Sequence, residues 1–123
     1  MNKRILIIED EDMIQSVLIK KLTESGFDVI SASDGESGLE LALKEDLDLI
    51  LLDIILPKMD GITLLEKYHH AKGQSGAPVL ILSNLDNAEK INESKSRGAF
   101  DYLVKTNWSL DDVVQKIKDT IGM

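Results

Sequence analysis

The sequence contains no cysteine among its 123 residues. A chain without cysteine has no disulfide, no thiolate zinc site and no cysteine nucleophile. Aromatic residues are also scarce, at 4% of the composition. Leucine, isoleucine and valine must therefore build the core, and the length is sufficient for one domain with a real core.

Basic residues are too few to balance the acidic ones. The chain has 14 Lys and Arg against 22 Asp and Glu, a formal net charge of −8. Nucleic-acid phosphates require a basic surface, so this balance argues against direct binding to DNA or RNA. No apolar run approaches the roughly 18 residues of a membrane span, and the first residues lack the pattern of a signal peptide. We therefore expect a cytoplasmic chain that does not bind a membrane.

Two hydrophobic periodicities alternate along the chain. Short apolar runs, typical of buried strands, alternate with segments whose apolar residues recur at helical spacing. The expected strands are residues 4–8, 27–32, 47–53, 77–83 and 99–104. The expected helices carry Ile14 to Leu22, Leu39 to Leu43, Ile62 to Tyr68, a polar stretch over 86–97, and a final stripe of Leu110, Val113, Val114, Ile117 and Ile121. Such alternation predicts an α/β fold, with parallel strands, right-handed crossovers and helices on both faces.

Two helix boundaries are marked in the sequence. Gly26 follows the first helix at the position where a left-handed residue commonly ends one. Ser109 is a good N-cap for the last helix, with Asp112 three residues later and Trp108 placed to pack against Val113. These signals indicate compact elements joined by short loops.

Polar side chains gather where the expected strands end. In an open α/β sheet, ligands bind outside the carboxyl ends of the strands. The first strand runs into the acidic stretch EDED, residues 9–12, and the other strands also end at polar groups. The side chains at these ends are Glu9, Asp10, Asp53, Ser83 and Lys105. The fold could bring all of them to one edge of the sheet.

The charges at this edge indicate a chemistry. Carboxylates gathered without a cation raise each other's pKa, and Mg²⁺, which prefers oxygen ligands and keeps open positions for water and phosphate oxygens, resolves that conflict. A carboxylate can also act as a nucleophile and form an acyl phosphate. Phosphoryl transfer needs mainly positioning and charge neutralisation, which Mg²⁺ and Lys105 could supply.

The other two acids of the stretch, Glu11 and Asp12, have a simpler interpretation. Acidic residues are favourable at the start of a helix because they interact with its dipole, and Asp12 is a candidate N-cap. We expect both to be solvated residues that need only water and the helix dipole, whereas Glu9 and Asp10 need a metal ion.

The same residues resemble the receiver domain of bacterial response regulators, the phosphoacceptor half of two-component signalling. The resemblance rests on Glu9-Asp10, on LLDIILPKMDG around Asp53, on Ser83 after VLIL and on Lys105 in DYLVK. It covers essentially the whole chain. It implies a flavodoxin-like, doubly wound (βα)5 fold with strand order 2-1-3-4-5. It also implies a single domain over residues 1–123, with no effector domain in the chain.

The resemblance assigns roles in phosphorylation. Asp53 would accept a phosphoryl group from a histidine kinase or a phosphotransfer protein. Ser83 would donate a hydrogen bond to the phosphoryl oxygens and Lys105 would pair with them. Tyr102 would be an aromatic switch that turns inward when Ser83 moves toward the phosphate.

The resemblance also assigns Mg²⁺ ligands. Asp10 would bind the ion directly, Glu9 would bind it directly or through water, and Asp53 would share it. The backbone carbonyl of Ile55 would complete the protein ligands.

Some positions depart from the usual receiver pattern. Lys105 is commonly followed by proline, but Thr106 follows here, and we expect a trans bond because a cis bond costs roughly 2.5–4 kcal/mol without proline. The residue after Ser83 is usually small, but here Asn84 could restrict access to small phosphodonors. Ile55 and Leu85 are apolar and cannot orient an attacking water, so we expect slow autodephosphorylation and no other enzymatic turnover.

The signal would leave through the helix expected over 86–97, the last strand and the last helix. That first helix has few apolar anchors, so we expect it to be held weakly. The receiving partner would be another protein or a second copy of the chain.

Other functions are compatible with the same fold class. A flavodoxin-type flavin module is disfavoured because an acidic loop follows the first strand. A phosphatase of the haloacid-dehalogenase type lacks its second acid, since Ile54-Ile55 follows Asp53. A pseudo-receiver, acting as an interaction module without phosphorylation, remains the main alternative.

Overall fold

A single parallel sheet forms the centre of the molecule. The computed structural model describes residues 2–123, and its strands have the order β2-β1-β3-β4-β5. The strands are β1 Arg4–Ile8, β2 Asp28–Ala32, β3 Leu49–Leu52, β4 Val79–Ser83 and β5 Asp101–Val104. The predicted fold class and strand order are confirmed. The last three strands begin two residues later than expected, because the apolar pattern extends beyond the hydrogen-bonded ladder.

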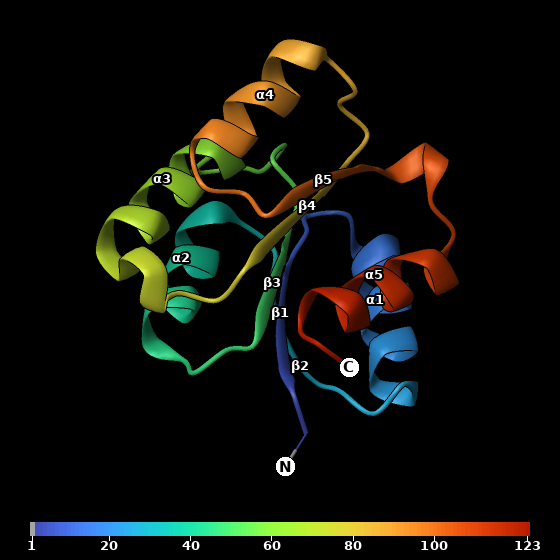
Figure 1. Cartoon of the computed structure of the whole chain (residues 1–123). Coiled ribbons are helices and arrows are strands. Elements are labelled where there is room, and N and C mark those ends of the chain that lie inside the picture. The colour runs from blue at the N-terminus through green and yellow to red at the C-terminus, as the bar shows by residue number, and fades with distance from the viewer. Residues whose placement is uncertain (1) are drawn as a thin grey trace.

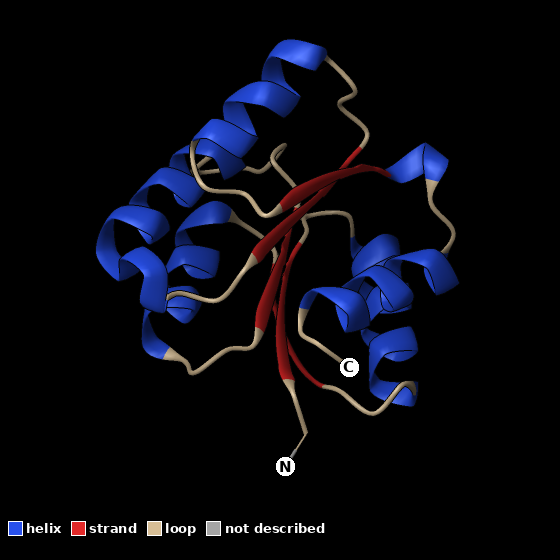
Figure 2. Ribbon diagram, viewed as in Figure 1, coloured by secondary structure: helices blue, strands red, loops and turns tan. Residues whose placement is uncertain are grey.

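Helices alternate with the strands and cover both faces of the sheet (Figures 1 and 2). They are α1 Asp12–Glu24, α2 Gly35–Lys44, α3 Gly61–Lys72, α4 Ala88–Ser96 and α5 Leu110–Thr120, with short 3₁₀ turns η1 Gly73–Ser75 and η2 Lys105–Asn107. Helices α1 and α5 lie on one side of the sheet, and α2, α3 and α4 lie on the other. Within residues 2–123, no helix combines the length and the apolar character needed to cross a bilayer.

The core is divided into two layers by the sheet. Successive residues of a strand point to opposite faces, so Ile5 and Ile7 pack with α1 and α5, whereas Leu6 and Ile8 pack with α2 and α3. Because both faces are covered, the central strands are apolar except at Arg4, where β1 begins, and at Ser83, where β4 ends. Aliphatic side chains dominate both layers, as the scarcity of aromatic residues predicts.

Side-chain caps mark four of the helix starts. The caps are Asp34, Asp60, Asn87 and Ser109, and each accepts a hydrogen bond from a backbone N–H of the first turn. Ser109 and Asp112 form the predicted capping box. The predicted stripe of α5 is buried at Val113, Val114 and Ile117. Leu110, in the first turn, has 40% of its surface exposed and lines an apolar hollow together with Val113.

The loop between β3 and α3 is held against neighbouring backbone. Gly35 donates its backbone N–H to the carbonyl of Pro57 at 3.1 Å, and a Cβ on Gly35 would overlap the carbonyl oxygen of Met59. At the other end of the loop, Gly61 donates to the carbonyl of Ile54 at 2.9 Å. A side chain at either glycine would displace the loop that begins at Asp53.

Candidate functional site

The register of the sheet brings the predicted residues to one edge. Ile8 of β1 is paired with Leu52 of β3, so the acids that follow them, Glu9 and Asp53, leave the sheet side by side. Both are buried, with 2% and 5% of their surface exposed. Asp10 is exposed next to them.

Lys105 joins the two buried acids. It follows β5 and reaches past the end of β4, where its Nζ lies 2.8 Å from Asp53 Oδ2 and 2.6 Å from Glu9 Oε1. The other oxygen of Asp53 accepts the backbone N–H of Ile55 at 3.0 Å. The pairing of Lys105 with Asp53 places a cation beside the predicted phosphoacceptor. The pairing with Glu9 was not predicted, because Glu9 was assigned only to the metal.

Burial and pairing shift the ionisation of this cluster. Burial raises the pKa of the Glu9 carboxyl, and its hydrogen bond with Lys105 offsets this only in part. Burial acts to lower the pKa of Lys105, but the hydrogen bonds to Asp53 and Glu9 outweigh it, so the pKa lies above its ordinary value. Lys105 therefore remains an ammonium ion between the two acids.

The three acids of the edge can share one cation. One carboxylate oxygen from each of Glu9, Asp10 and Asp53 lies within 4.8 Å of the others. Hard divalent ions such as Mg²⁺ take oxygen ligands of this kind. With these three carboxyls ionised, their charge of −3 and the positive charge of Lys105 sum to −2, which is the charge that a divalent ion neutralises.

Ser83 and Tyr102 hold the backbone of Leu85 from two sides. Ser83 is fully buried at the end of β4, and its Oγ accepts the N–H of Leu85 at 3.3 Å. Tyr102 points inward with 8% of its surface exposed and donates its hydroxyl to the carbonyl of Leu85. Burial raises the pKa of this hydroxyl, which keeps it protonated as a donor. The two side chains therefore connect the open edge of the sheet to the loop that leads into α4.

The remaining acids of the EDED stretch differ from each other. Glu11, rather than Asp12, occupies the N-cap position of α1, and its side chain makes no capping hydrogen bond. Its carboxylate is exposed, as predicted, but it also lies 3.6 Å from Lys105 Nζ. Asp12 is an exposed first-turn residue. The interpretation of Glu11 as a purely solvated residue is therefore wrong.

The backbone after Lys105 tests the prediction of a trans peptide bond. The peptide bond to Thr106 is trans, as expected, and no cis bond occurs within residues 2–123. A short 3₁₀ turn, η2, begins at Lys105. The ammonium is thus positioned by its two short carboxylate contacts without a following proline.

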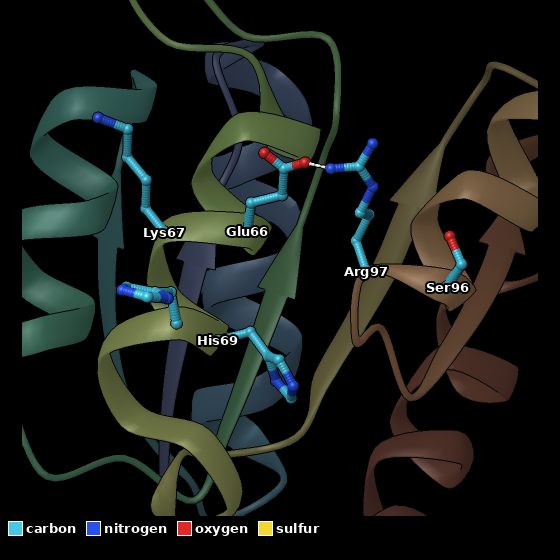
Figure 3. A pocket seen from close by; sticks show the side chains of 6 residues that line it. Glu66, Lys67, His69, Ser96 and Arg97 are labelled. Atoms are coloured by element: carbon cyan, nitrogen blue, oxygen red, sulfur yellow. Dashed lines mark ion pairs between the residues drawn. The ribbon is translucent and has the colours of Figure 1, made fainter.

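A hollow lies between α3 and the end of α4, away from the carboxyl edge of the sheet. It has a volume of about 570 Å³ and is lined by Glu66, Lys67, His69, His70, Ser96 and Arg97. Figure 3 shows Glu66 and Arg97 pointing toward each other, and they form an ion pair, whereas Lys67 points away from Arg97. The side chains do not converge on a common point. Both histidines are exposed.

The hydrogen bond from Tyr102 to the carbonyl of Leu85 can be tested as a connection between the sheet edge and α4. Changing Tyr102 to Phe leaves the carbonyl of Leu85 without its donor, and we expect the free energy of unfolding to fall by about 1 kcal/mol. Amide hydrogen exchange at Leu85 and in the first turn of α4 should become faster. Tyr68→Phe is the matched control, since Tyr68 is also buried and its hydroxyl accepts the N–H of Ala77 at 2.7 Å. Equal exchange at Leu85 in the two variants would contradict the link.

Comparison with known proteins agrees with this geometry. A family model described as the response regulator receiver domain matches residues 5–118. The alkaline phosphatase synthesis transcriptional regulatory protein PhoP of Bacillus subtilis is 42% identical over 105 residues, covering 85% of this chain and 43% of that protein. The chain spans about half the length of the curated relatives that it matches.

Solved structures give the same assignment. A CheY-like response regulator receiver domain protein from Methanospirillum hungatei JF-1 is 30% identical, with a TM-score of 0.92 over 99% of this chain and 95% of that one. A CheX–CheY–BeF₃–Mg²⁺ complex from Borrelia burgdorferi is 28% identical, with a TM-score of 0.87 over 95% of this chain and 87% of that one. The chain belongs to the response regulator receiver domain family of two-component systems.

Proposed function

We propose that this chain is a phosphoacceptor, which receives a phosphoryl group on Asp53 from a histidine kinase or a phosphotransfer protein. The observation that carries the proposal is the pairing of a buried aspartate with Lys105 at 2.8 Å at the open edge of the sheet. The second oxygen of Asp53 is oriented by the N–H of Ile55. A relative with 28% identity has been solved with BeF₃ and Mg²⁺, which supports the same chemistry here.

The transfer is a displacement at phosphorus. An oxygen of the Asp53 carboxylate forms a bond to phosphorus while the bond between phosphorus and the donor atom breaks, and the donor leaves with the electron pair. Lys105 then pairs with the new phosphoryl oxygens, and Ser83 turns its hydroxyl toward them. Both residues already lie at the carboxyl edge of the sheet, so neither needs a large rearrangement.

Mg²⁺ is the proposed cofactor. Glu9, Asp10 and Asp53 would hold it, together with the backbone carbonyl of Ile55, and the geometry of the three carboxylates fits a hard cation. When bound, the ion would neutralise the negative charge that gathers during phosphoryl transfer.

An apolar hollow supports a protein as the donor. It has a volume of about 350 Å³ between α1 and α5, and Lys105 contributes to its wall. Met13 and Val17 of α1 and Leu110 of α5 line it and are 81%, 41% and 40% exposed. A protein donor that covers these side chains would present its phosphoryl group beside the carboxylate edge.

The output would leave through α4, β5 and α5 toward another protein or a second copy of the chain. Ser94 is the one buried residue of α4 among the residues described. Because so little of the helix is buried, the position of α4 can respond to small changes in the loop at Leu85. A direct role at DNA or a membrane is not proposed, since the net charge is −8. A cytoplasmic location stays a prediction.

Phosphorylation is tested by intact mass. Incubation with Mg²⁺ and acetyl phosphate at neutral pH should add the mass of one phosphoryl group to the wild-type chain, and Asp53→Asn should add none. Asp60→Asn, which alters an exposed acid in the same loop, should behave like wild type. An interaction module without phosphorylation predicts no adduct from either acetyl phosphate or a histidine kinase.

Metal binding is tested by titration with Mg²⁺. Asp10→Ala should weaken Mg²⁺ binding at least about tenfold, because it removes a proposed ligand. Asp12→Ala removes the same charge from a neighbouring exposed residue and should change the affinity much less. Isothermal titration calorimetry measures both, and equal losses in the two variants would exclude Asp10 as a ligand.

We also expect the phosphoryl group on Asp53 to be lost slowly. The Ile55 side chain is 55% exposed beside Asp53, and it offers no hydrogen bond to a water that attacks the acyl phosphate. Ile55→Asn should therefore accelerate dephosphorylation, measured as the decay of the adduct after removal of the donor, and Ile55→Leu should not. Rapid decay in the wild type, unchanged in Ile55→Asn, would refute this role.

A further inference from the structure

Glu11 has a contact that its place in the sequence does not explain. The carboxylate lies 3.6 Å from Lys105 Nζ, while the Lys105 side chain is only 10% exposed and that of Glu11 is 55% exposed. The backbone N–H of Glu11 donates a hydrogen bond to Glu9 Oε2 at 3.2 Å. This bond fixes the start of α1 against the buried Glu9 carboxylate. Glu11 therefore lies between Lys105 and solvent.

Three carboxylates share the Lys105 ammonium. Glu9 and Asp53 make the short contacts of 2.6 and 2.8 Å, and Glu11 makes the longer one of 3.6 Å. Glu9 and Asp53 lie within hydrogen-bonding distance of Nζ, whereas Glu11 interacts with it only as an ion pair. A negatively charged phosphodonor that approaches Lys105 from solvent therefore meets the exposed Glu11 carboxylate beside the ammonium.

A general preference for acids at a helix start does not account for this contact. Asp12 is the next residue, with the same charge and the same proximity to the helix N-terminus, yet within residues 2–123 it forms no ion pair. The helix dipole would act on both residues alike. The contact with Lys105 belongs to Glu11 alone of the two.

We propose that Glu11 determines donor specificity: it occupies the exposed side of Lys105 and disfavours phosphorylation of Asp53 by small free anionic donors. The inference rests on the proposed function of Asp53. A free donor such as acetyl phosphate brings its negative charge toward Lys105 past the Glu11 carboxylate. A protein donor can neutralise Glu11 with a basic side chain and so release Lys105 for the phosphoryl group.

Phosphorylation of Asp53 by acetyl phosphate is a displacement at phosphorus. An Asp53 carboxylate oxygen forms a bond to the phosphorus of acetyl phosphate, the bond from phosphorus to the acetate oxygen breaks, and acetate leaves with the electron pair. Glu11 takes no part in bond making. It acts through the position of Lys105 and through repulsion of the donor, over a distance well within the Debye length of about 10 Å at about 0.1 M salt.

The test compares Glu11→Gln with Asp12→Asn. Each variant removes one negative charge, and the two positions are adjacent. At low ionic strength, Glu11→Gln should increase the rate of adduct formation from acetyl phosphate about three- to tenfold, whereas Asp12→Asn should change it by less than about twofold. The gain should shrink as salt is added, and it should be smaller with phosphoramidate, which carries less negative charge at neutral pH.

These readouts separate a charge effect from a structural one. A folding defect in Glu11→Gln would lower the urea midpoint and would not give a gain that depends on salt and on donor charge. If the wild type forms an adduct but Glu11→Gln and Asp12→Asn react at the same rate, the role of Glu11 is overturned and that of Asp53 stands. If no variant forms an adduct with either donor, the phosphoacceptor function itself is overturned, and the role of Glu11 with it.

Discussion

The organisation of the site depends on one ammonium group held between two buried carboxylates. Glu9 and Asp53 are almost completely removed from water, and two such charges side by side are strongly unfavourable without a counter-charge. Lys105 supplies it at 2.6 and 2.8 Å. Because these residues follow β1, β3 and β5, the contact also ties the carboxyl ends of three strands together. It leaves the edge with a deficit of positive charge, which is the condition for binding a further cation.

The two sides of this edge are held with different strength. On the side of Asp53, the loop to α3 is fixed by backbone hydrogen bonds at Gly35 and Gly61 and by close packing that excludes side chains there. On the other side, the loop to α4 is held at Leu85 by two hydrogen bonds: Ser83 accepts the Leu85 N–H, and Tyr102 donates to its carbonyl. We therefore expect a change of charge at Asp53 to move the second loop more easily than the first. This expectation agrees with the proposed output through α4.

The sequence predicted the elements well because each depends on a local pattern. Alternating runs of apolar residues located the strands and helices, and the cap at Ser109 follows directly from residue type. Strand order is different, since it depends on which strands pair in space, and here it came from the family resemblance. The exposure of Leu110 was not predicted, because helical periodicity does not indicate where the neighbouring element stops covering a helix.

The same distinction applies to the four acids of residues 9–12. Their sequence gives four adjacent like charges, but the chain changes from strand to helix within the stretch, and their side chains enter different surroundings. Glu9 is buried and paired with Lys105, and Asp10 is exposed but can share a cation with it. Glu11 turns back to the outer side of Lys105, and Asp12 faces water at the first turn of α1.

Local pattern could separate the strand-end pair, Glu9 and Asp10, from the helix-start pair, Glu11 and Asp12. The separation of Glu11 from Asp12 required the position of a lysine more than ninety residues away, because repulsion within the stretch is relieved by tertiary contacts rather than by neighbours in sequence.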